Sequence, residues 1–80
     1  MIKSIEKILN DNEIVNLNEV YDFFSSTNDV FIIKYDGIRE FKKYNIIIIG
    51  KESRFETINF EIENLQEGIK KALGEYQKFI

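Results

Sequence analysis

Four consecutive isoleucines at positions 46–49 constrain the fold of this chain more than any other stretch. Successive side chains of a β-strand point to opposite faces, so the run places branched apolar groups on both faces of one strand. Tyr44 and Asn45 precede the run, and Gly50 follows it. We therefore predict that residues 38–49 form the middle strand of a three-stranded antiparallel sheet.

The residues before this run predict a first strand and a tight turn. Val30–Tyr35 is rich in β-branched and aromatic residues, a composition typical of strands. Asp36 and Gly37 follow, and this dipeptide favours a two-residue hairpin turn because both residues adopt positive φ readily. The first strand is therefore expected to turn directly into the strand over residues 38–49.

The residues after the run predict a second turn and a third strand. Residues 50–53 read Gly-Lys-Glu-Ser, a composition typical of turns. Residues 54–62 alternate between apolar and polar side chains, with Ile58, Phe60 and Ile62 on one face. Short turns between sequential strands predict an antiparallel meander.

Apolar residues at helical spacing predict helices before the sheet. The first is expected over residues 3–9, and the Asn-Asp-Asn sequence at 10–12 interrupts it because these side chains compete for backbone hydrogen bonds. A second helix is expected after Asn16, which would cap it together with Glu19. Its apolar face would consist of Leu17, Val20, Tyr21 and Phe24. Two separate helices and one helix bent at residues 10–12 both fit this pattern.

A final helix is predicted after the sheet. Asn64 is its expected N-cap, with Glu67 as the reciprocal capping partner. Its apolar stripe would consist of Leu65, Ile69, Ala72, Leu73, Tyr76 and Phe79 or Ile80.

These elements predict one α+β domain over residues 1–80, a length typical of a single domain. Residues 1–28 would form the helical N-terminal segment, residues 29–62 the sheet and residues 63–80 the C-terminal helix. The expected element order is α(α)-β-β-β-α. The N-terminal sequence lacks the long apolar stretch of a signal peptide, and no apolar run is long enough to span a membrane, so a cytoplasmic location is expected.

The composition disfavours several classes of chemistry. The chain has no Cys and no His. It therefore offers no disulfide, no thiolate ligand, no thiol nucleophile and no imidazole for acid–base catalysis or metal binding. No catalytic residues, no cofactor and no metal site are predicted, and the chain is not expected to be an enzyme. Heavy use of isoleucine, asparagine and lysine is typical of AT-rich bacterial or phage genomes.

The net charge of −3 belongs to the N-terminal segment, where residues 1–28 carry two lysines and five acidic residues. An acidic surface is expected from Asp11, Glu13, Glu19 and Asp22. It is interpreted either as a solvated helix face or as a surface that steers a basic partner, such as a nuclease or a nucleic-acid-binding enzyme. Nucleic acid itself is disfavoured as a partner, because a neutral-to-acidic domain binds phosphate poorly.

The alternation of side chains predicts two apolar faces on the sheet. One face would carry Tyr44, Ile46, Ile48, Ile58, Phe60 and Ile62, joined by Val30, Ile32 and Ile38 from the first hairpin. The other face would carry Phe31, Ile33, Tyr35, Phe41, Ile47, Ile49 and Phe55, which we predict to form a protein interface. This assignment depends on the register of the first hairpin.

Three arrangements could cover the second apolar face. The N-terminal helices could cover one face while the C-terminal helix covers the other. Two copies of the chain could pair as a homodimer through the sheet. A different protein could dock there. The sequence leaves all three open.

The first hairpin is basic, with Lys34, Arg39, Lys42 and Lys43 near Tyr35 and Phe41. Cations interleaved with aromatic rings can bind single-stranded nucleic acid, but lysine also protects edge strands from aggregation. Asp36, Glu40 and Lys42 loosely follow the acidic and lysine pattern of metal-dependent nucleases, although a charged turn gives the same pattern.

From Leu17 to Phe79 the expected α-β-β-β-α order resembles the double-stranded-RNA-binding domain in topology alone. In that family a lysine-rich start of the final helix crosses the phosphates. Here residues 61–67 read Glu-Ile-Glu-Asn-Leu-Gln-Glu, and no lysine precedes Lys70. No RNA-contacting residue is therefore carried over from that family.

Two functions are expected from these features. The first is a small, acidic, non-catalytic protein that acts by protein–protein binding, similar in size and charge to bacterial immunity proteins and to phage anti-defence inhibitors such as anti-CRISPR proteins. The alternative is a nucleic-acid-binding module that uses the basic first hairpin.

Overall fold

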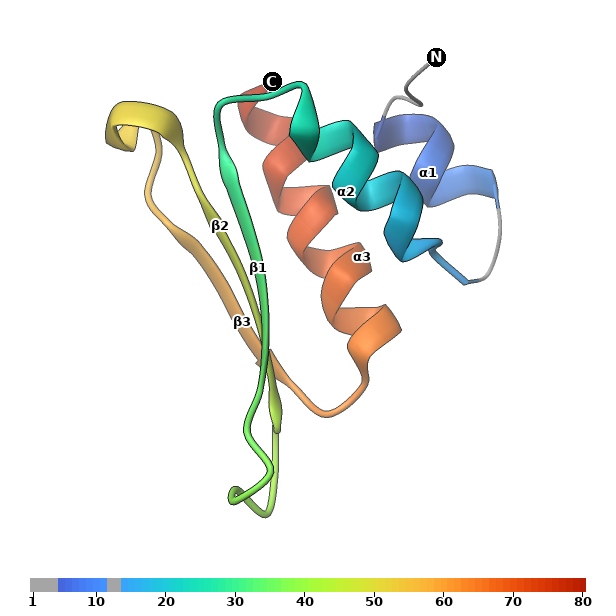
Figure 1. Ribbon diagram of the computed structural model, residues 1–80, viewed down its shortest axis with the longest axis vertical. Helices are drawn as coiled ribbons and strands as arrows, with labels where there is room; N and C mark the ends of the chain where they lie inside the picture. The colour runs from blue at the N-terminus through green and yellow to red at the C-terminus, as the bar shows by residue number, and fades with distance from the viewer. Residues whose placement is uncertain (1–4, 12–13) are drawn as a thin grey trace.

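A computed structural model describes residues 5–11 and 14–80 of the chain, and it contains one three-stranded sheet with helices on one side (Figure 1). The helices are α1 (Ile5–Asp11), α2 (Leu17–Ser25) and α3 (Leu65–Tyr76), and the strands are β1 (Val30–Tyr35), β2 (Tyr44–Ile49) and β3 (Ile58–Ile62). Two short 3₁₀ turns are η1 (Lys51–Ser53) and η2 (Gln77–Phe79). The predicted α+β fold and the antiparallel β1-β2-β3 meander are confirmed. The N-terminal region contains two separate helices, α1 and α2, and not one bent helix.

Asparagine caps define where two of the helices begin, as the sequence predicted. The side-chain oxygen of Asn16 accepts hydrogen bonds from the backbone N–H groups of Asn18 at 2.9 Å and Glu19 at 3.4 Å. The side-chain oxygen of Asn64 accepts from the N–H of Glu67 at 2.9 Å. Each cap satisfies donors that the first helical turn leaves unpaired.

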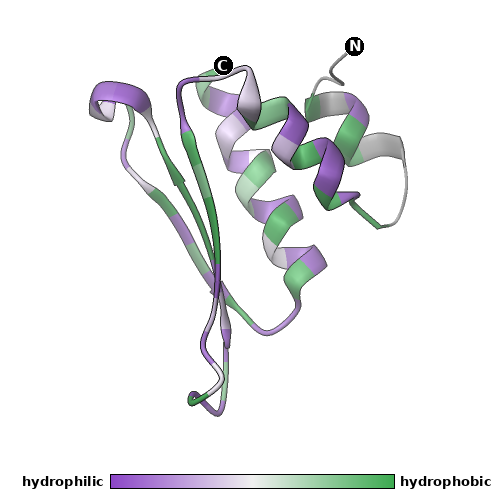
Figure 2. Cartoon of the chain, viewed as in Figure 1, coloured by the Kyte–Doolittle hydropathy of each residue, from purple (hydrophilic) through white to green (hydrophobic). Residues whose placement is uncertain are grey.

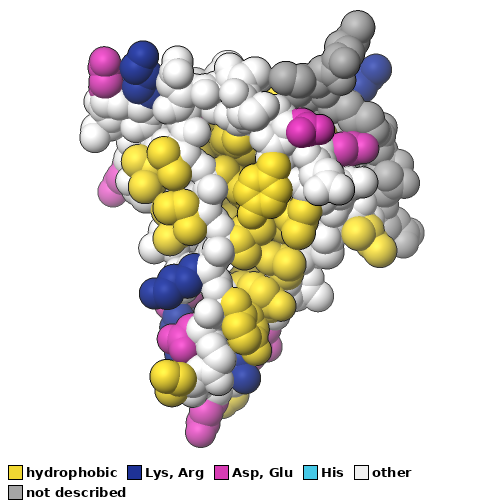
Figure 3. Space-filling model, in the orientation of Figure 1, with side chains coloured by type: hydrophobic (Ala, Val, Ile, Leu, Met, Phe, Trp, Pro, Cys, Tyr) yellow, Lys and Arg dark blue, Asp and Glu magenta, His cyan; other side chains and the backbone are white. Residues whose placement is uncertain are grey.

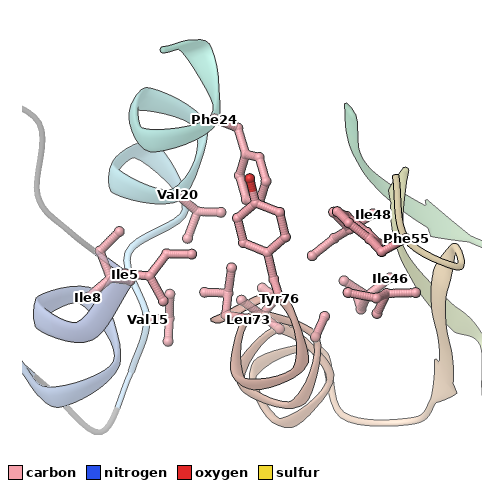
Figure 4. Packing of buried hydrophobic residues seen from close by; sticks show 13 residues of the cluster. Ile5, Ile8, Val15, Val20, Phe24, Ile46, Ile48, Phe55, Leu73 and Tyr76 are labelled. Atoms are coloured by element: carbon pink, nitrogen blue, oxygen red, sulfur yellow. The ribbon is translucent and has the colours of Figure 1, made fainter. Parts of the chain in front are cut away.

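The core lies between the sheet and the helices (Figure 4). Tyr76 of α3 lies at its centre and is 1% exposed, with Phe24 of α2 beside it at a ring-centroid distance of 5.0 Å. The other buried residues are Ile5, Ile8, Val15, Val20, Ile46, Ile48, Phe55, Ile58, Ile69, Ala72 and Leu73. Because α3 packs on β2 and β3 while α2 packs near β1, both helices share one face of the sheet.

Gly68 permits the close packing of α3 on the sheet. A Cβ atom at this position would lie 2.5 Å from Cγ2 of Ile62 and 3.0 Å from Cγ1 of Ile46. At Gly74, by contrast, no heavy atom lies within 4 Å of the equivalent position. The helix therefore tolerates Gly74, whereas the packing requires Gly68.

The connection between β1 and β2 is longer than predicted, and the prediction of a two-residue turn at Asp36 and Gly37 is wrong. Strand β2 begins at Tyr44, so residues 36–43 form the connection. The backbone N–H of Asp36 donates to the carbonyl of Lys43 at 2.8 Å and closes this loop. Gly37 does not adopt the positive φ that the predicted turn would need.

Cross-strand burial explains the longer connection. A two-residue turn would place Tyr35 opposite residue 38 and would leave the isoleucine run without a partner in β1. In the observed register Ile32 lies opposite Ile47, and Ile33 lies opposite Ile46. Pairing of branched apolar residues across the strands therefore outweighs the local turn preference of the dipeptide.

The third strand is shorter than the predicted range of 54–62, because β3 begins at Ile58. Arg54 extends instead to the carboxylate of Asp29. Phe55 turns into the core, where its ring stacks on Phe79 at a centroid distance of 4.6 Å. These contacts withdraw residues 54 and 55 from the sheet.

Candidate functional site

The sheet has a helix-covered face, hereafter the helix face, and an opposite face, hereafter the open face. Residues opposite each other in an antiparallel pair share a face, and Ile33 lies opposite Ile46. Odd-numbered residues of β1 therefore share the helix face with even-numbered residues of β2. The prediction that Val30 and Ile32 lie with Ile46 on the helix face is wrong, because it assumed the opposite parity.

The helix face carries several residues that the sequence assigned to the interface. Phe31 and Ile33 are partly buried and pack against the core. Phe55 is buried beside Tyr76. Tyr35 also belongs to the helix face, although it is 57% exposed. The assignment of these four residues to the second apolar face is therefore wrong.

Phe41 and Ile38 lie in the connection between β1 and β2, outside the strands. Both side chains are largely exposed, so neither joins the face to which the sequence assigned it. Of the predicted interface residues, Ile47 and Ile49 are those that β2 places on the open face.

Ile47 and Ile49 are joined on the open face by Val30 and Ile32 of β1, which lie directly opposite Ile49 and Ile47. These four residues are called the apolar patch. Val30 is 46% exposed, Ile32 39% and Ile49 38%, while Ile47 is partly buried. Within the described residues all three helices lie on the other face of the sheet (Figure 1), so of the three arrangements considered, the one in which helices cover both faces is not observed.

The remainder of the open face is polar, and two pairs of its side chains interact with each other. Asn45 of β2 donates from Nδ2 to Oδ1 of Asn59 at 2.9 Å. Arg39 and Glu61 form an ion pair at 2.6 Å. Figure 2 shows that the ribbon of β1 is mainly apolar near its start and more polar toward the connecting hairpin. The open face is therefore apolar at one end and hydrophilic at the other.

Energetics bound what the apolar patch could contribute to binding. Full burial of a valine or isoleucine side chain contributes roughly 1.5–3 kcal/mol, so covering the exposed two-fifths contributes about 0.5–1 kcal/mol per residue. The three exposed residues of the patch and the less exposed Ile47 supply at most about 2–4 kcal/mol, which is less than the roughly 8 kcal/mol of a micromolar complex. A stable complex would therefore need contacts beyond the patch.

The predicted acidic surface is described in part. Glu19 and Asp22 lie on α2, where Asp22 is exposed and Glu19 is partly exposed. Asp11 ends α1, but its side chain lies outside the described residues, as does the whole of Glu13. The described part of α2 thus carries two carboxylates and no cation.

The basic residues of the first hairpin do not form one cluster. Lys34 lies on β1, and Arg39 pairs with Glu61. Lys42 lies in the connection between β1 and β2 and adopts a positive φ of 51°. It lines an open hollow of about 550 Å³ between this connection and the start of α3. This hollow is lined by Phe41, Lys42, Glu61, Ile62, Glu63, Asn64, Glu67 and Lys71. Three carboxylates beside two lysines make it an unsuitable phosphate site.

Of the nuclease-like pattern at Asp36, Glu40 and Lys42, Asp36 has a structural role in the loop. The Asp36 carboxylate accepts a hydrogen bond from the N–H of Ile38 at 2.9 Å, which shapes the loop. In the part of the chain that the structure describes, no three Asp, Glu, His or Cys side chains gather in a way that could hold a metal ion.

A polar cluster that the sequence reasoning missed lies at the end of the sheet near η1. The Asp29 carboxylate, 2% exposed, accepts hydrogen bonds from both terminal guanidinium nitrogens of Arg54, from the Tyr76 hydroxyl and from the Lys51 backbone N–H at 2.8 Å. The Arg54 guanidinium also lies over the Phe55 ring at 4.9 Å. We call Asp29, Arg54 and Tyr76 the Asp29 cluster.

The Asp29 cluster shifts the ionisation of its members. The hydrogen bond from Arg54 holds the pKa of Asp29 well below its usual range, and that same hydrogen bond raises the pKa of Arg54. Burial, followed by the hydrogen bond to Asp29, raises the pKa of Tyr76 to about 12. Asp29 immediately precedes β1, Lys51 and Arg54 lie in and just after η1, and Tyr76 lies in α3. These charge-assisted hydrogen bonds therefore join three segments of the chain.

Comparison with protein families, with curated proteins and with solved structures finds no match. No described helix has both the length and the apolar character needed to cross a membrane.

Proposed function

We propose that this protein acts without catalysis by binding another protein through the open face of its sheet. The observation that carries this proposal is the apolar patch, which the helices leave exposed. Exposed branched side chains on adjacent strands are a typical feature of protein interfaces. The adjoining polar groups, including Asn45 and Asn59, would form the hydrophilic rim of such an interface.

The partner is proposed to be a basic protein, and the function that of an inhibitor of the immunity-protein or phage anti-defence type. The net charge of −3 supports this proposal, because unlike charges accelerate encounter. Asp22 and Glu19 on α2 contribute to this field at positions away from the patch. The charge would thus affect the rate of association, and the patch would provide the contact that holds the complex together.

The test compares three baits in affinity capture from a bacterial lysate: the wild-type chain, Ile47→Lys and Gln77→Lys. Ile47 lies on the open face, whereas Gln77 is exposed in η2 beyond α3. A protein captured by the wild type and by Gln77→Lys is expected to be lost with Ile47→Lys. The captured protein is then purified, and its affinity for each variant is measured by calorimetry.

The contribution of Ile47 to the apolar patch determines how much affinity Ile47→Lys is expected to lose. Loss of one apolar contact and burial of a lysine would weaken binding by about a hundredfold, or about 3 kcal/mol. Circular dichroism must show that Ile47→Lys remains folded, and unfolding of this variant would mean that Ile47 belongs to the core. Equal affinity of the two lysine variants would refute the open face as the binding surface.

A nucleic-acid-binding module is the second candidate, supported by the exposed Phe41 ring beside Lys42. The glutamates that line the same hollow disfavour it. Binding of single-stranded and double-stranded RNA and DNA is measured by fluorescence anisotropy at about 50 mM salt, where even non-specific contacts should register. Affinity that falls steeply with salt and is lost in Lys42→Glu would favour this candidate, and absence of binding would refute it.

A further inference from the structure

Strand β1 has a free edge that differs from the other edge of the sheet. The sheet order is β1-β2-β3, and no other strand in the described residues pairs with the outer side of β1. Strand β3, at the other edge, is flanked by Glu56 and Glu63 and contains Glu61. Such charges discourage pairing with another chain. Strand β1 also contains one charged residue, Lys34, but three of its six side chains, Val30, Ile32 and Tyr35, are exposed and apolar, so β1 is the more apolar edge.

The backbone groups at this edge can be assigned from the hydrogen bond between Asp36 and Lys43. That bond makes residues 36 and 43 a hydrogen-bonded pair, and such pairs alternate with non-bonded ones along antiparallel strands. The backbone N–H and C=O groups of Phe31, Ile33 and Tyr35 therefore point away from β2. They form a row of donors and acceptors spaced for another strand.

Exposed hydrophobic side chains follow the same edge (Figure 3). On the helix side Tyr35 is 57% exposed, and Tyr21 of α2, whose ring meets Phe31 edge-on at 5.6 Å, is 47% exposed. On the open side lie Val30 and Ile32 of the apolar patch. A strand added to β1 would cover apolar groups on both sides of the new backbone pairing.

The charges at the two ends of β1 are complementary. At its C-terminal end, residues 34–43 carry three lysines and two carboxylates besides Arg39, which is already paired with Glu61. Near its N-terminal end, α2 carries Glu19 and Asp22 and no cation. An antiparallel copy of β1 would bring the cationic hairpin of one molecule to the acidic helix of the other, twice over by symmetry.

We propose that two copies of this chain associate through antiparallel pairing of their β1 strands, with the two-fold axis at Ile33, to form a continuous six-stranded sheet. This register pairs Phe31 of each copy with Tyr35 of the other and Ile33 with itself, so all the outward backbone groups of β1 are used. Aromatic cross-strand pairs stabilise such an arrangement. On the open face Ile32 would lie opposite Lys34 of the second copy, and the two lysines would not face each other.

This surface is distinct from the one in the proposed function. The dimer uses the edge of β1, while the proposed binding partner uses the open face. Pairing of two copies would place Ile32 of each molecule opposite Lys34 of the other, so the two apolar patches would lie on either side of the two-fold axis with the lysines between them. The Cys-free sequence allows a sharp test, because any engineered disulfide must join two chains.

The test introduces single cysteines at positions 32 and 34. Under the proposed register Ile32→Cys lies opposite Lys34→Cys of the other copy at a Cα separation of about 4.5–5.5 Å, which a disulfide can span. Each variant alone would place its two cysteines about 8 Å apart, beyond the usual range. An equimolar mixture under mild oxidation is therefore expected to form disulfide-linked heterodimers about tenfold faster than either variant alone.

Thr57→Cys serves as the control, because Thr57 is exposed beside β3 at the other edge of the sheet. Mixed with Lys34→Cys, it is expected to crosslink only at the slow background rate. Circular dichroism melts confirm that all three variants are folded, and all three substitutions replace exposed side chains. Sedimentation velocity of the wild type over about a hundredfold range of concentration is expected to show a monomer–dimer equilibrium.

Three outcomes would overturn the proposal. A wild-type chain that remains monomeric at every concentration would leave the β1 edge to a strand of a different protein. Self-crosslinking of Ile32→Cys or Lys34→Cys as fast as the mixture would exclude the register centred on Ile33. Equally fast crosslinking through Thr57→Cys would place the contact at β3.

Discussion

The two faces of the sheet divide one run of identical residues into two environments. Ile46 and Ile48 point to the helix face and are fully buried, while Ile49 on the open face is 38% exposed. The residue type and the strand are the same. The difference arises from the helices, because α1, α2 and α3 of the described residues all pack on one side of the sheet. In this protein hydrophobicity alone therefore does not decide which isoleucines form the core.

The largest expected contrast is between alanine substitutions at adjacent positions of β2. Ile46→Ala should reduce the free energy of unfolding by about 2–5 kcal/mol, because it leaves a cavity under α3. Ile47→Ala should cost less than about 1 kcal/mol, because Ile47 lacks a helix above it. Urea denaturation followed by circular dichroism measures both. Equal costs would mean that the open face is covered in solution.

The next effect concerns the Asp29 cluster, which links the start of β1 to α3. Asp29→Asn should cost about 2 kcal/mol at neutral pH, because charge-assisted hydrogen bonds are replaced by weaker ones. Arg54 holds the pKa of Asp29 below its ordinary value of 3.8, so ionised Asp29 stabilises the folded state. This stabilisation is fully present above that value and is lost as the pH falls below it.

Thermal unfolding across the acidic range measures this pH dependence. The wild type should lose stability more steeply than Asp29→Asn as the pH falls below about 4. Parallel curves for the two proteins would show that the Asp29 carboxylate is not ionised and paired in the folded state.

A smaller effect is expected at the two glycines of α3. Gly68→Ala should destabilise by about 1–2 kcal/mol, because the added methyl group would overlap Ile62 and Ile46 on the helix face. Gly74→Ala should stabilise by about 0.5–1 kcal/mol, because it restores helix propensity in open space. Melting temperatures compare the two variants. Stabilisation by both would mean that α3 does not pack closely on the sheet.

The smallest effect on stability is expected for Ile49→Thr. This change keeps β-branching on the open face and removes part of an already exposed apolar surface, so the free energy of unfolding should change by less than about 0.5 kcal/mol. Chemical denaturation provides the measurement. A loss comparable with that of Ile46→Ala would erase the distinction between the two faces.

Local signals explain which features could be predicted from the sequence. Asn16 and Asn64 act within one helical turn, so both caps can be predicted from the sequence. The limits of β1 and the β1-β2-β3 order were also predicted, since they depend on composition and chain connectivity. The open position of Ile47 and Ile49 followed from alternation along β2.

The features that could not be predicted depend on contacts between distant segments. Asp36 and Gly37 gave a strong local turn signal, but pairing of the isoleucine run with β1 outweighed it. The predicted parity of β1 is wrong for a different reason. It placed even-numbered residues of β1 with even-numbered residues of β2, whereas Ile33 lies opposite Ile46, so Val30 and Ile32 belong to the apolar patch. No spacing pattern connects Asp29 with Arg54 and Tyr76, so the Asp29 cluster had no signature in the sequence.

The Asp29 cluster also has a consequence for the order of folding. Its hydrogen bonds join residues separated by 22, 25 and 47 positions along the chain. Such contacts require closure of long loops, and they form only after the strands and α3 have come together. Loss of Asp29 should therefore accelerate unfolding more than it slows folding, which makes this carboxylate a determinant of the lifetime of the native state.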